Sequence, residues 1–332
     1  MHENEKVISS PISAHSNSNA IKISWNRNLA FYIGITVVIV YAALFFEPYY
    51  QRLLIEMMIF ALLAMSLDLL VGFTGIVSFG HAAFFGLTMY TSGILITKLG
   101  WPFLLGAIVA FIFTIIVSAL IGWFCVRLSG IQFAMLTLAF GMLIWTIITK
   151  WREVTNGLDG FSVSEGLSIN LGVIELPLTD PLVLLFITAG VLIVSFWSMN
   201  RLVKSNFGQV LIAIRENEDR TGFLGFSNTY IKLQVFLISA AYASIAGILF
   251  MLLKTFVSPD FVHWAFSGNI LMMTILGGMG TIFGPLLGAG LFIWLQDWAS
   301  SYTENWMIII GFIFVLVVLY LPRGVFGWMF KK

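Results

Sequence analysis

Long apolar stretches, separated by short polar or glycine-rich segments, run along most of this chain. Ten of them stand out, at 29–46, 53–71, 82–97, 103–124, 131–149, 181–199, 233–253, 267–280, 286–298 and 306–321. A membrane-crossing helix needs about 20 mainly apolar residues, and most of these stretches approach that length. The stretches 82–97, 267–280 and 286–298 are short and adjoin glycine clusters, so we expect tilted, broken or re-entrant helices there. The pattern predicts an all-α polytopic membrane protein with about ten transmembrane helices.

Composition agrees with this pattern and narrows the class of protein. Of the 332 residues, 59% are hydrophobic and only 10% are charged, whereas soluble domains have about 25% charged residues. The chain has too few polar residues to cover a soluble surface, which excludes a water-soluble enzyme, a nucleic-acid-binding protein and a disordered chain. Aromatic residues reach 15%, as suits a surface in contact with lipid and its interfaces.

The basic residues predict how the chain is oriented in the membrane. With ten spans and the N-terminus inside, twelve of the seventeen Lys and Arg residues fall in cytoplasmic segments, as the positive-inside rule favours. We therefore expect a cytoplasmic tail at 1–28, a transmembrane domain at 29–327 and a cytoplasmic tail at 328–332. The long loop 150–180 is then external, and the long loop 200–232 is cytoplasmic.

The cytoplasmic loop contains a predicted short helix over 207–220. Phe207, Leu211 and Ile214 lie about one turn apart and form a narrow apolar stripe, and five of the six residues 215–220 are charged. This pattern is typical of a helix that inserts its apolar face into a groove of a partner protein. The alternative is a helix that lies on lipid headgroups, which the mixed charge disfavours.

Glycine gathers in two clusters beside predicted spans, over 72–86 and 277–290. Such clusters mark either close helix packing, as the spacing of Gly284 and Gly288 suggests, or broken helices whose free N–H groups can meet a carboxylate. Both interpretations stay open from the sequence. On the second, the candidate pathway residues are Thr74, Gly75, Ser78, His81, Gly277, Gly278 and Gly280.

Two carboxylates, Glu56 and Asp68, lie inside the second predicted span. They are on different faces of the helix, about 120° apart at 100° per residue, so they do not form a proton relay. We expect Glu56 to pair with Arg52 one turn away, while Asp68 can hydrogen-bond the broken backbone near Gly72. No Lys-Ser or Lys-Thr pair follows the glycines, and the histidines show no metal-ligand spacing. We therefore predict no catalytic residue, no metal site and no cofactor.

Six motifs that occur in order between residues 53 and 327 resemble a known family. They are Gly72–Gly86 with Thr88-Met-Tyr90, Arg127–Phe140, Thr155-Asn-Gly-Leu-Asp-Gly160, Gly208–Gly225, Leu276–Pro285 and Leu321–Phe326. Together they resemble the permease subunits of branched-chain amino acid ABC importers, specifically the M-type subunit. Two positions depart from the family pattern, because Ile76 stands where Gln is frequent and Asn156 where Gly is frequent.

The resemblance implies one half of a pore in the cell inner membrane. It implies contact with membrane lipid and no nucleic-acid partner. The implied partners are a homologous second permease, two ABC ATPase subunits and an external substrate-binding protein. ATP hydrolysis belongs to those partners, so we expect a transport subunit and not an enzyme. The implied ATPase-coupling helix carries Gly208, Ala213, Arg215, Glu216, Asn217, Glu218 and Gly222. The implied external motif carries Thr155, Gly157, Asp159 and Gly160.

Three alternatives stay open at this point. Related permeases carry urea or short amides, and they share most of these motifs. A stand-alone secondary carrier or facilitator would work without ATPases, although the spans lack the chain of charged residues that ion coupling usually requires. A membrane scaffold or membrane-embedded enzyme is the third, and the sequence shows no nucleophile–base pair or zinc motif for it.

Overall fold

Nine helices carry the predicted spans in the part of the chain that the computed structural model describes, which is residues 41, 45–163, 166–170, 175–321 and 324–326. The predicted first span at 29–46 lies outside these residues except for its end, as do the tails 1–28 and 328–332. The nine helices are α2 (Pro48–Val71), α3 (His81–Thr97), α4 (Phe103–Cys125), α5 (Gly130–Lys150), α7 (Pro181–Lys204), α10 (Asn228–Lys254), α11 (Trp264–Gly277), α12 (Phe283–Ser300) and α13 (Trp306–Tyr320).

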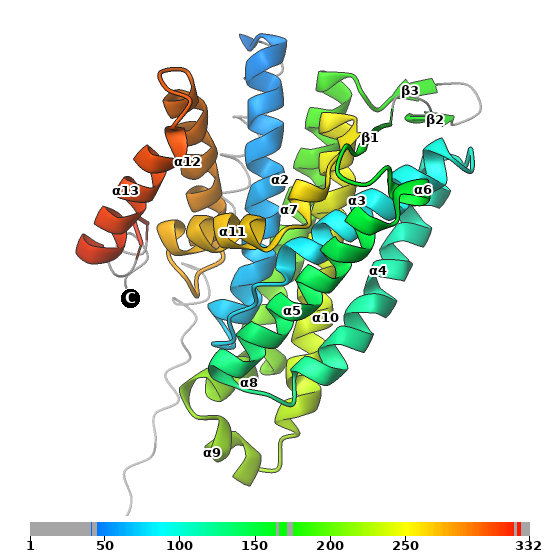
Figure 1. Cartoon of the computed structure of the whole chain (residues 1–332). Helices are drawn as coiled ribbons and strands as arrows, with labels where there is room; N and C mark the ends of the chain where they lie inside the picture. The colour runs from blue at the N-terminus through cyan, green and yellow to red at the C-terminus, as the bar shows by residue number, and fades with distance from the viewer. Residues whose placement is uncertain (1–40, 42–44, 164–165, 171–174, 322–323, 327–332) are drawn as a thin grey trace, which may run out of the picture.

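The other described elements are short and gather at the two ends of the helix bundle (Figure 1). Near one end lie α6 (Arg152–Thr155) and two small antiparallel pairs, β1 (Phe161–Ser162) with β4 (Phe256–Val257) and β2 (Ser168–Asn170) with β3 (Glu175–Pro177). The 3-10 helix η1 (Pro259–Phe261) follows β4. At the opposite end lie α8 (Asn206–Glu216) and α9 (Glu218–Phe223). The prediction of an all-α polytopic membrane protein is confirmed.

The helices differ in how far they can reach across a bilayer. Five described helices are long and apolar enough to cross it, namely α2, α4, α5, α7 and α10. The 14 residues of α11 rise only about 21 Å, less than the ~30 Å hydrocarbon core. The expectation of a short helix before the second glycine cluster is therefore confirmed, since α11 ends at Gly277.

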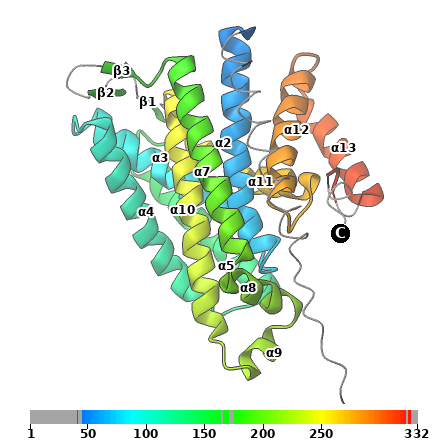
Figure 2. The same ribbon diagram turned by 180° about the vertical axis from the view of Figure 1, so that it is seen from behind.

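Helix α2 is the buried centre of the bundle. It is hydrophobic on every side, and each residue from Met58 to Val71 is buried. Helices α7, α10, α11 and α12 pack around it (Figures 1 and 2), as expected for a helix that is apolar all round. Helix α4 is different, because Leu105, Ile112, Ile116 and Leu120 are exposed on its outer side. That apolar surface is typical of contact with lipid or another membrane subunit.

Small residues allow α11 and α12 to approach closely. A Cβ on Gly284 or Gly288 would overlap backbone carbonyl oxygens of the facing segment, which are those of Gly278 and Met273. The small-xxx-small packing predicted for Gly284 and Gly288 is confirmed. Between these helices the chain turns through Gly278 and Gly280 at φ angles of 115° and 76°. The second glycine cluster thus combines close packing with an interruption of the helix.

Candidate functional site: a junction of two glycine loops with α8

Two loops rich in glycine meet α8 at its end of the bundle. The first, residues 72–80, joins α2 to α3, and the second, residues 278–282, joins α11 to α12. The backbone N–H of Gly280 donates to Asp68 Oδ1 at 2.9 Å. Arg215 Nη1, from α8, donates to the backbone carbonyl of Gly72. The last turn of α2 is therefore tied both to the second loop and to α8, and we call this site the junction.

The centre of the junction has no room for a side chain. A Cβ on Gly72 would overlap both Asp68 Oδ1 and the Gly280 nitrogen. A Cβ on Gly280 would lie 3.0 Å from Arg215 Nη1, and one on Gly75 would lie 3.1 Å from Arg215 Cγ. Gly75 and Gly280 also have φ angles of 79° and 76°, which side-chain-bearing residues rarely adopt. Backbone contact across the junction therefore depends on glycine.

Asp68 supplies the side chain that holds the two loops together. It is only 1% exposed, and among the described residues its Oδ2 has no hydrogen-bond partner. The sequence predicted a bond to the backbone near Gly72, whereas the carboxylate binds Gly280 of the other glycine cluster. Arg215, which donates to the Gly72 carbonyl, contributes a second side-chain hydrogen bond to the same site. The junction is thus held by side-chain hydrogen bonds as well as by close backbone contact.

The other carboxylate of α2 has a different partner from the predicted one. Glu56 Oε2 lies 2.9 Å from Lys254 Nζ, at the end of α10, so the predicted pair with Arg52 is wrong. The α2–α10 packing brings the lysine to Glu56, which sequence spacing does not reveal. This pair lies at the opposite end of α2 from the junction and fastens two central helices to each other.

Most of the seven candidate pathway residues lie around the junction but have no exposed surface to offer. Gly75 is exposed and Gly280 is half-buried. The other five are buried, namely Thr74, Ser78, His81, Gly277 and Gly278. In this conformation, a molecule in solution reaches Gly75 before it reaches any of the three polar side chains.

The three polar side chains of this set differ in how well they are satisfied. Thr74 Oγ1 donates to the carbonyl of Leu69 at 2.9 Å, and His81 Nε2 lies 2.7 Å from Ser66 Oγ. Ser78 Oγ and His81 Nδ1 have no hydrogen-bond partner among the described residues. Buried polar groups without partners are uncommon, so the end of the first loop and the start of α3 have unused hydrogen-bonding capacity.

The second glycine cluster does not keep the N–H groups of Gly278, Gly280 and Gly284 free for a carboxylate ligand. The Gly278 N–H donates to the Thr274 carbonyl at 3.1 Å, and the Gly284 N–H donates to Thr281 Oγ1 at 3.1 Å. The Gly280 N–H is occupied by Asp68. For these three groups, the broken-helix interpretation with donors awaiting a substrate is wrong, because the chain itself satisfies them.

A cavity of about 440 Å³ opens beside the exposed Gly75. Val77 and Phe79 of the first loop form one wall, and Ala134, Met135 and Leu138 of α5 form the other. Its lining is apolar, so it can accept an aliphatic group and would reject a charged one. No three His, Cys, Asp or Glu side chains in the described part of the chain are grouped closely enough to hold a metal ion.

The apolar stripe of α8 faces the chain's own core and not a partner. Leu211 and Ile214 are buried, and Phe207 is half-buried against the core. The prediction that this stripe inserts into a partner's groove is therefore wrong. The exposed apolar side chains come later, at the end of α9, where Phe223 is 91% exposed and Leu224 is 70% exposed. The stripe anchors α8, and the surface available to a partner is the α9 tip.

The single helix predicted over 207–220 is in fact two helices that meet at Asn217. The Asn217 side chain caps α9 by accepting from the Arg220 N–H at 2.9 Å. Glu218 forms an ion pair with Lys232, a buried lysine of α10 that no local sequence pattern distinguishes. Asn228 also donates to the Glu218 carbonyl, at 2.6 Å. These contacts brace α9 against α10.

The remaining residues of the implied coupling helix divide into two groups. Gly208 packs so closely against the Val203 carbonyl that a Cβ there would overlap it, and Ala213 is half-buried. Arg215, Glu216 and Gly222 are exposed. Arg215 is the exception among the exposed residues, since it also reaches inward to Gly72.

The motif predicted to be external, residues 155–160, is a tight turn after α5, and we keep the name external turn for it. Thr155 Oγ1 donates to the Trp151 carbonyl at 2.8 Å and accepts from the Gly157 N–H at 3.3 Å. Asn156 has a φ angle of 64°, and its side chain donates to the Gly160 carbonyl at 2.6 Å. Asn tolerates this left-handed conformation better than most residues, which explains why it can replace the family's usual glycine.

The same turn attaches the loop to the strand after α10. Gly160 has a φ angle of 66°, and a Cβ there would overlap the Val257 carbonyl oxygen of β4. Beside it, β1 pairs with β4. Asp159 is exposed. Three of the four motif residues, Thr155, Gly157 and Gly160, therefore shape the turn, and Asp159 is the one whose side chain points to the surroundings.

Comparison with known proteins identifies relatives along most of the chain. Residues 49–318 match the family model described as branched-chain amino acid transport system / permease component. The LivM permease protein of the high-affinity branched-chain amino acid transport system of Salmonella typhimurium is 31% identical over 80% of this chain and 67% of its own length. LivM of Escherichia coli is 30% identical over the same shares. BraD of Pseudomonas aeruginosa is 26% identical over 81% of this chain and 91% of its own length.

No solved structure matches the chain. The family model covers the helices from α2 to most of α13, together with both glycine loops, α8 and the external turn. Identity to the LivM proteins exceeds that to LivH of Escherichia coli, which is 24%. The chain belongs to the family of branched-chain amino acid transport permease components, as an M-type member.

Proposed function

We propose that this chain forms half of the translocation pore of an ATP-driven ABC importer for branched-chain amino acids. The other half is a homologous permease, two ABC ATPase subunits bind at the α8–α9 end, and an external binding protein delivers the substrate. The permease domain spans 29–327, between cytoplasmic tails at 1–28 and 328–332. The chain contributes no ATP hydrolysis of its own. Family membership supports the substrate class, and the following contacts support the mechanism.

One observation carries the coupling step, namely the bond from Arg215 to Gly72. Arg215 lies on α8, directly before the exposed α9 tip, and its guanidinium contacts the end of the central helix α2. Asp68, one turn earlier on α2, binds the second glycine loop through Gly280. A displacement of α8 by an ATPase would therefore move both glycine loops together. The first of these loops borders the apolar cavity at Gly75, which suits an aliphatic side chain in transit.

The proposed orientation has α8, α9 and both termini in the cytoplasm and the turn of Thr155, Gly157, Asp159 and Gly160 outside. The basic residues support it through the positive-inside rule, and the two loop regions lie at opposite ends of the bundle. Single cysteines at Asp159 and Asp219, both exposed, test the orientation with a membrane-impermeant maleimide on intact cells. We expect labelling at Asp159→Cys only, and labelling at Asp219→Cys only would reverse the topology.

The partner proposal is tested by purifying the chain in mild detergent from its native membrane and identifying the co-purifying subunits by mass. A second permease and two Walker-containing ATPases are the expected companions. Phe223→Asp places a charge on the exposed α9 tip and should release the ATPases. Tyr302→Asp is the matched control, because Tyr302 is 76% exposed near the opposite end of the bundle. Equal retention of ATPases in both variants would contradict docking at α9.

The coupling step is tested separately from docking. Arg215→Ala removes the bond to Gly72, so substrate-stimulated ATP hydrolysis should continue while uptake per ATP falls at least tenfold. Arg152→Ala is the matched control, since Arg152 is an exposed arginine of α6, at the opposite end of the bundle from α8 and α9. Unchanged uptake per ATP in Arg215→Ala would remove the junction from the coupling step.

Two other functions give different results in the same system. Uptake by the chain alone in liposomes, driven by an ion gradient or by the substrate's own gradient, identifies a stand-alone carrier. Competition of uptake by urea or a short amide, with no effect of leucine, isoleucine or valine, identifies a permease for those solutes. The branched-chain proposal requires competition by the three aliphatic amino acids.

A further inference from the structure

A groove with a volume of about 720 Å³ lies between α7 and α10, on the α8 side of the bundle. It is separate from the cavity at Gly75 and from the junction. Its size falls within the range of ~300–1,000 Å³ that is usual for small-molecule sites. Such a groove on the flank of a membrane helix bundle adjoins the bilayer, so its occupant can enter from the lipid.

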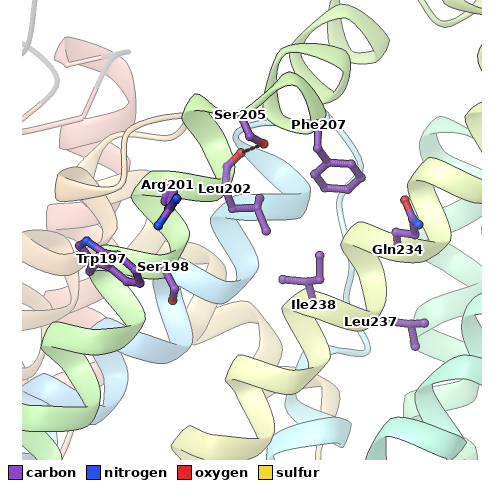
Figure 3. Close-up of a pocket in the computed structure, with 9 residues that line it drawn as sticks. All are labelled: Trp197, Ser198, Arg201, Leu202, Ser205, Phe207, Gln234, Leu237 and Ile238. Carbon is purple, nitrogen blue, oxygen red and sulfur yellow. Dashed lines mark hydrogen bonds between the residues drawn. The ribbon is translucent and has the colours of Figure 1, made fainter. Parts of the chain in front are cut away.

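The walls of the groove are suited to hydrocarbon. Leu202 of α7 and Ile238 of α10 extend into it from opposite sides, and Leu237 adds to the α10 wall (Figure 3). Phe207, from the first turn of α8, lies at the end of the groove where α8 begins (Figure 3). Because these side chains are branched aliphatic or aromatic, the groove favours an apolar chain over a hydrated solute.

The rim of the groove on α7 is cationic and has the features of a membrane interface. Arg201 is exposed, and its guanidinium carbon lies 5.5 Å from the centre of the Trp197 ring. Within the described ranges, neither of the two ion pairs between side chains involves Arg201. Trp is enriched at headgroup level, and a long arginine side chain reaches from apolar surface to the polar boundary. The rim therefore offers one positive charge beside an apolar slot.

We propose that this groove binds an anionic phospholipid from the leaflet on the α8 side. An acyl chain lies between Leu202 and Ile238, and the phosphate accepts hydrogen bonds from the Arg201 guanidinium, which suits phosphate geometry. Basic pockets between membrane helices are known places for anionic headgroups. A protein segment fits the groove less well than a lipid does. Arg201 at the rim favours an anion, and the phosphate of a lipid lies at the headgroup level of the membrane, where Trp197 also places Arg201. Since Phe207 belongs to α8, the lipid holds the helix that carries Arg215 against α7 and α10.

The test measures lipid binding directly and does not depend on transport. The full-length chain, purified with the subunits that accompany it, is stripped of lipid and titrated with phosphatidylglycerol, and native mass spectrometry counts the bound lipids. Arg201→Gln should weaken the tightest phosphatidylglycerol site about fivefold. Arg127→Gln is a closely matched control, because Arg127 lies 4.4 Å from the Trp123 ring at the end of α4, outside this groove. It should leave that site unchanged.

A second variant tests the acyl part independently of charge. Ile238→Trp fills the slot and should remove the same site while Arg201 stays in place, with the melting temperature in detergent confirming that the variant is folded. Equal loss in Arg201→Gln and Arg127→Gln would overturn the proposal by showing diffuse attraction to charge. Equally tight binding of phosphatidylcholine would overturn it as well. Failure of the importer proposal would leave these binding results untouched.

Discussion

The external turn and the junction are both built on glycine, yet they are held in opposite ways. In the external turn, Thr155 and Asn156 satisfy neighbouring backbone groups of the same segment, and Gly160 packs against β4. In the junction, three distant segments are joined by two side-chain bonds, those of Asp68 and Arg215. The turn is locally complete, whereas the junction exists only while the helices stay in register.

The two regions also differ in what they leave unsatisfied. At the junction, Asp68 Oδ2 has no hydrogen-bond partner, and the nearby Ser78 Oγ and His81 Nδ1 also lack one within the described residues. No atom of the external motif residues Thr155, Asn156 or Asp159 is among the buried unpartnered side-chain atoms that the described part contains. Unpaired buried polar groups are costly, so a conformation that pairs them would be favoured at the junction. Glycine therefore shapes a locally satisfied turn at one end of this protein and, at the other end, a contact that we expect to rearrange.

The largest expected effect comes from adding a methyl group where backbones touch. A Cβ on Gly277 would overlap the Gly284 carbonyl, whereas a Cβ on Gly268 of the same helix meets nothing within 4 Å. We expect Gly277→Ala to lower the free energy of unfolding by about 3 kcal/mol or more, since neither backbone can move aside. Gly268→Ala should be neutral or slightly stabilising. Melting temperature in detergent compares them, and similar values for both would contradict the close α11–α12 contact.

The next effect tests whether the junction depends on the Asp68 acceptor. Asp68→Leu leaves the Gly280 N–H without its partner, which should cost about 1–3 kcal/mol of unfolding free energy. Asp68→Asn retains an oxygen acceptor at the same position and should recover most of that loss. The two variants are compared by melting temperature and by protease cleavage at residues 278–282. Equal destabilisation by both would mean that charge, and not the hydrogen bond, holds the loop.

The external turn should respond to backbone conformation alone. Asn156→Ala places a residue with a plain Cβ at φ 64° and removes the bond to the Gly160 carbonyl, at a cost of about 1–2 kcal/mol. Asn156→Gly should retain stability, because glycine adopts this conformation freely. Uptake per ATP, measured on the protein that remains folded, should be the same in both variants. A change in uptake per ATP would show that the turn is not merely structural, which would weaken the comparison.

Much of the fold could be predicted because a membrane-spanning helix requires a continuous apolar stretch of sequence. The stretches 103–124 and 131–149 became α4 (Phe103–Cys125) and α5 (Gly130–Lys150) with shifts of one residue at most. The apolar stripe of α8 was also recognised from its spacing. Its partner was assigned wrongly, because periodicity shows that one face of a helix is buried and does not show what covers it.

The junction could be predicted only as separate pieces. The two glycine clusters, Asp68 and Arg215 were each identified from the sequence, but no local pattern shows that residues 72, 215 and 280 meet. The same reason explains the wrong partner of Glu56, since Arg52 is one turn away in sequence while Lys254 approaches through α2–α10 packing. Contacts between distant segments depend on tertiary packing, which single-sequence spacing does not record.

The smallest expected change in stability comes from Ser78, one of the buried groups near the junction that have no described hydrogen-bond partner. Ser78 Oγ is fully buried without a described partner, so Ser78→Ala removes no hydrogen bond and should not lower the unfolding free energy. Ser66→Ala is the matched control, because Ser66 Oγ donates to the Leu63 carbonyl at 2.6 Å and lies 2.7 Å from His81 Nε2. Its loss should cost about 1 kcal/mol. If Ser78 meets the substrate when the loops rearrange, Ser78→Ala raises the KM for uptake several-fold at unchanged stability. An unchanged KM would leave the hydroxyl with no part in transport and restrict the rearrangeable contact to Asp68 and Arg215.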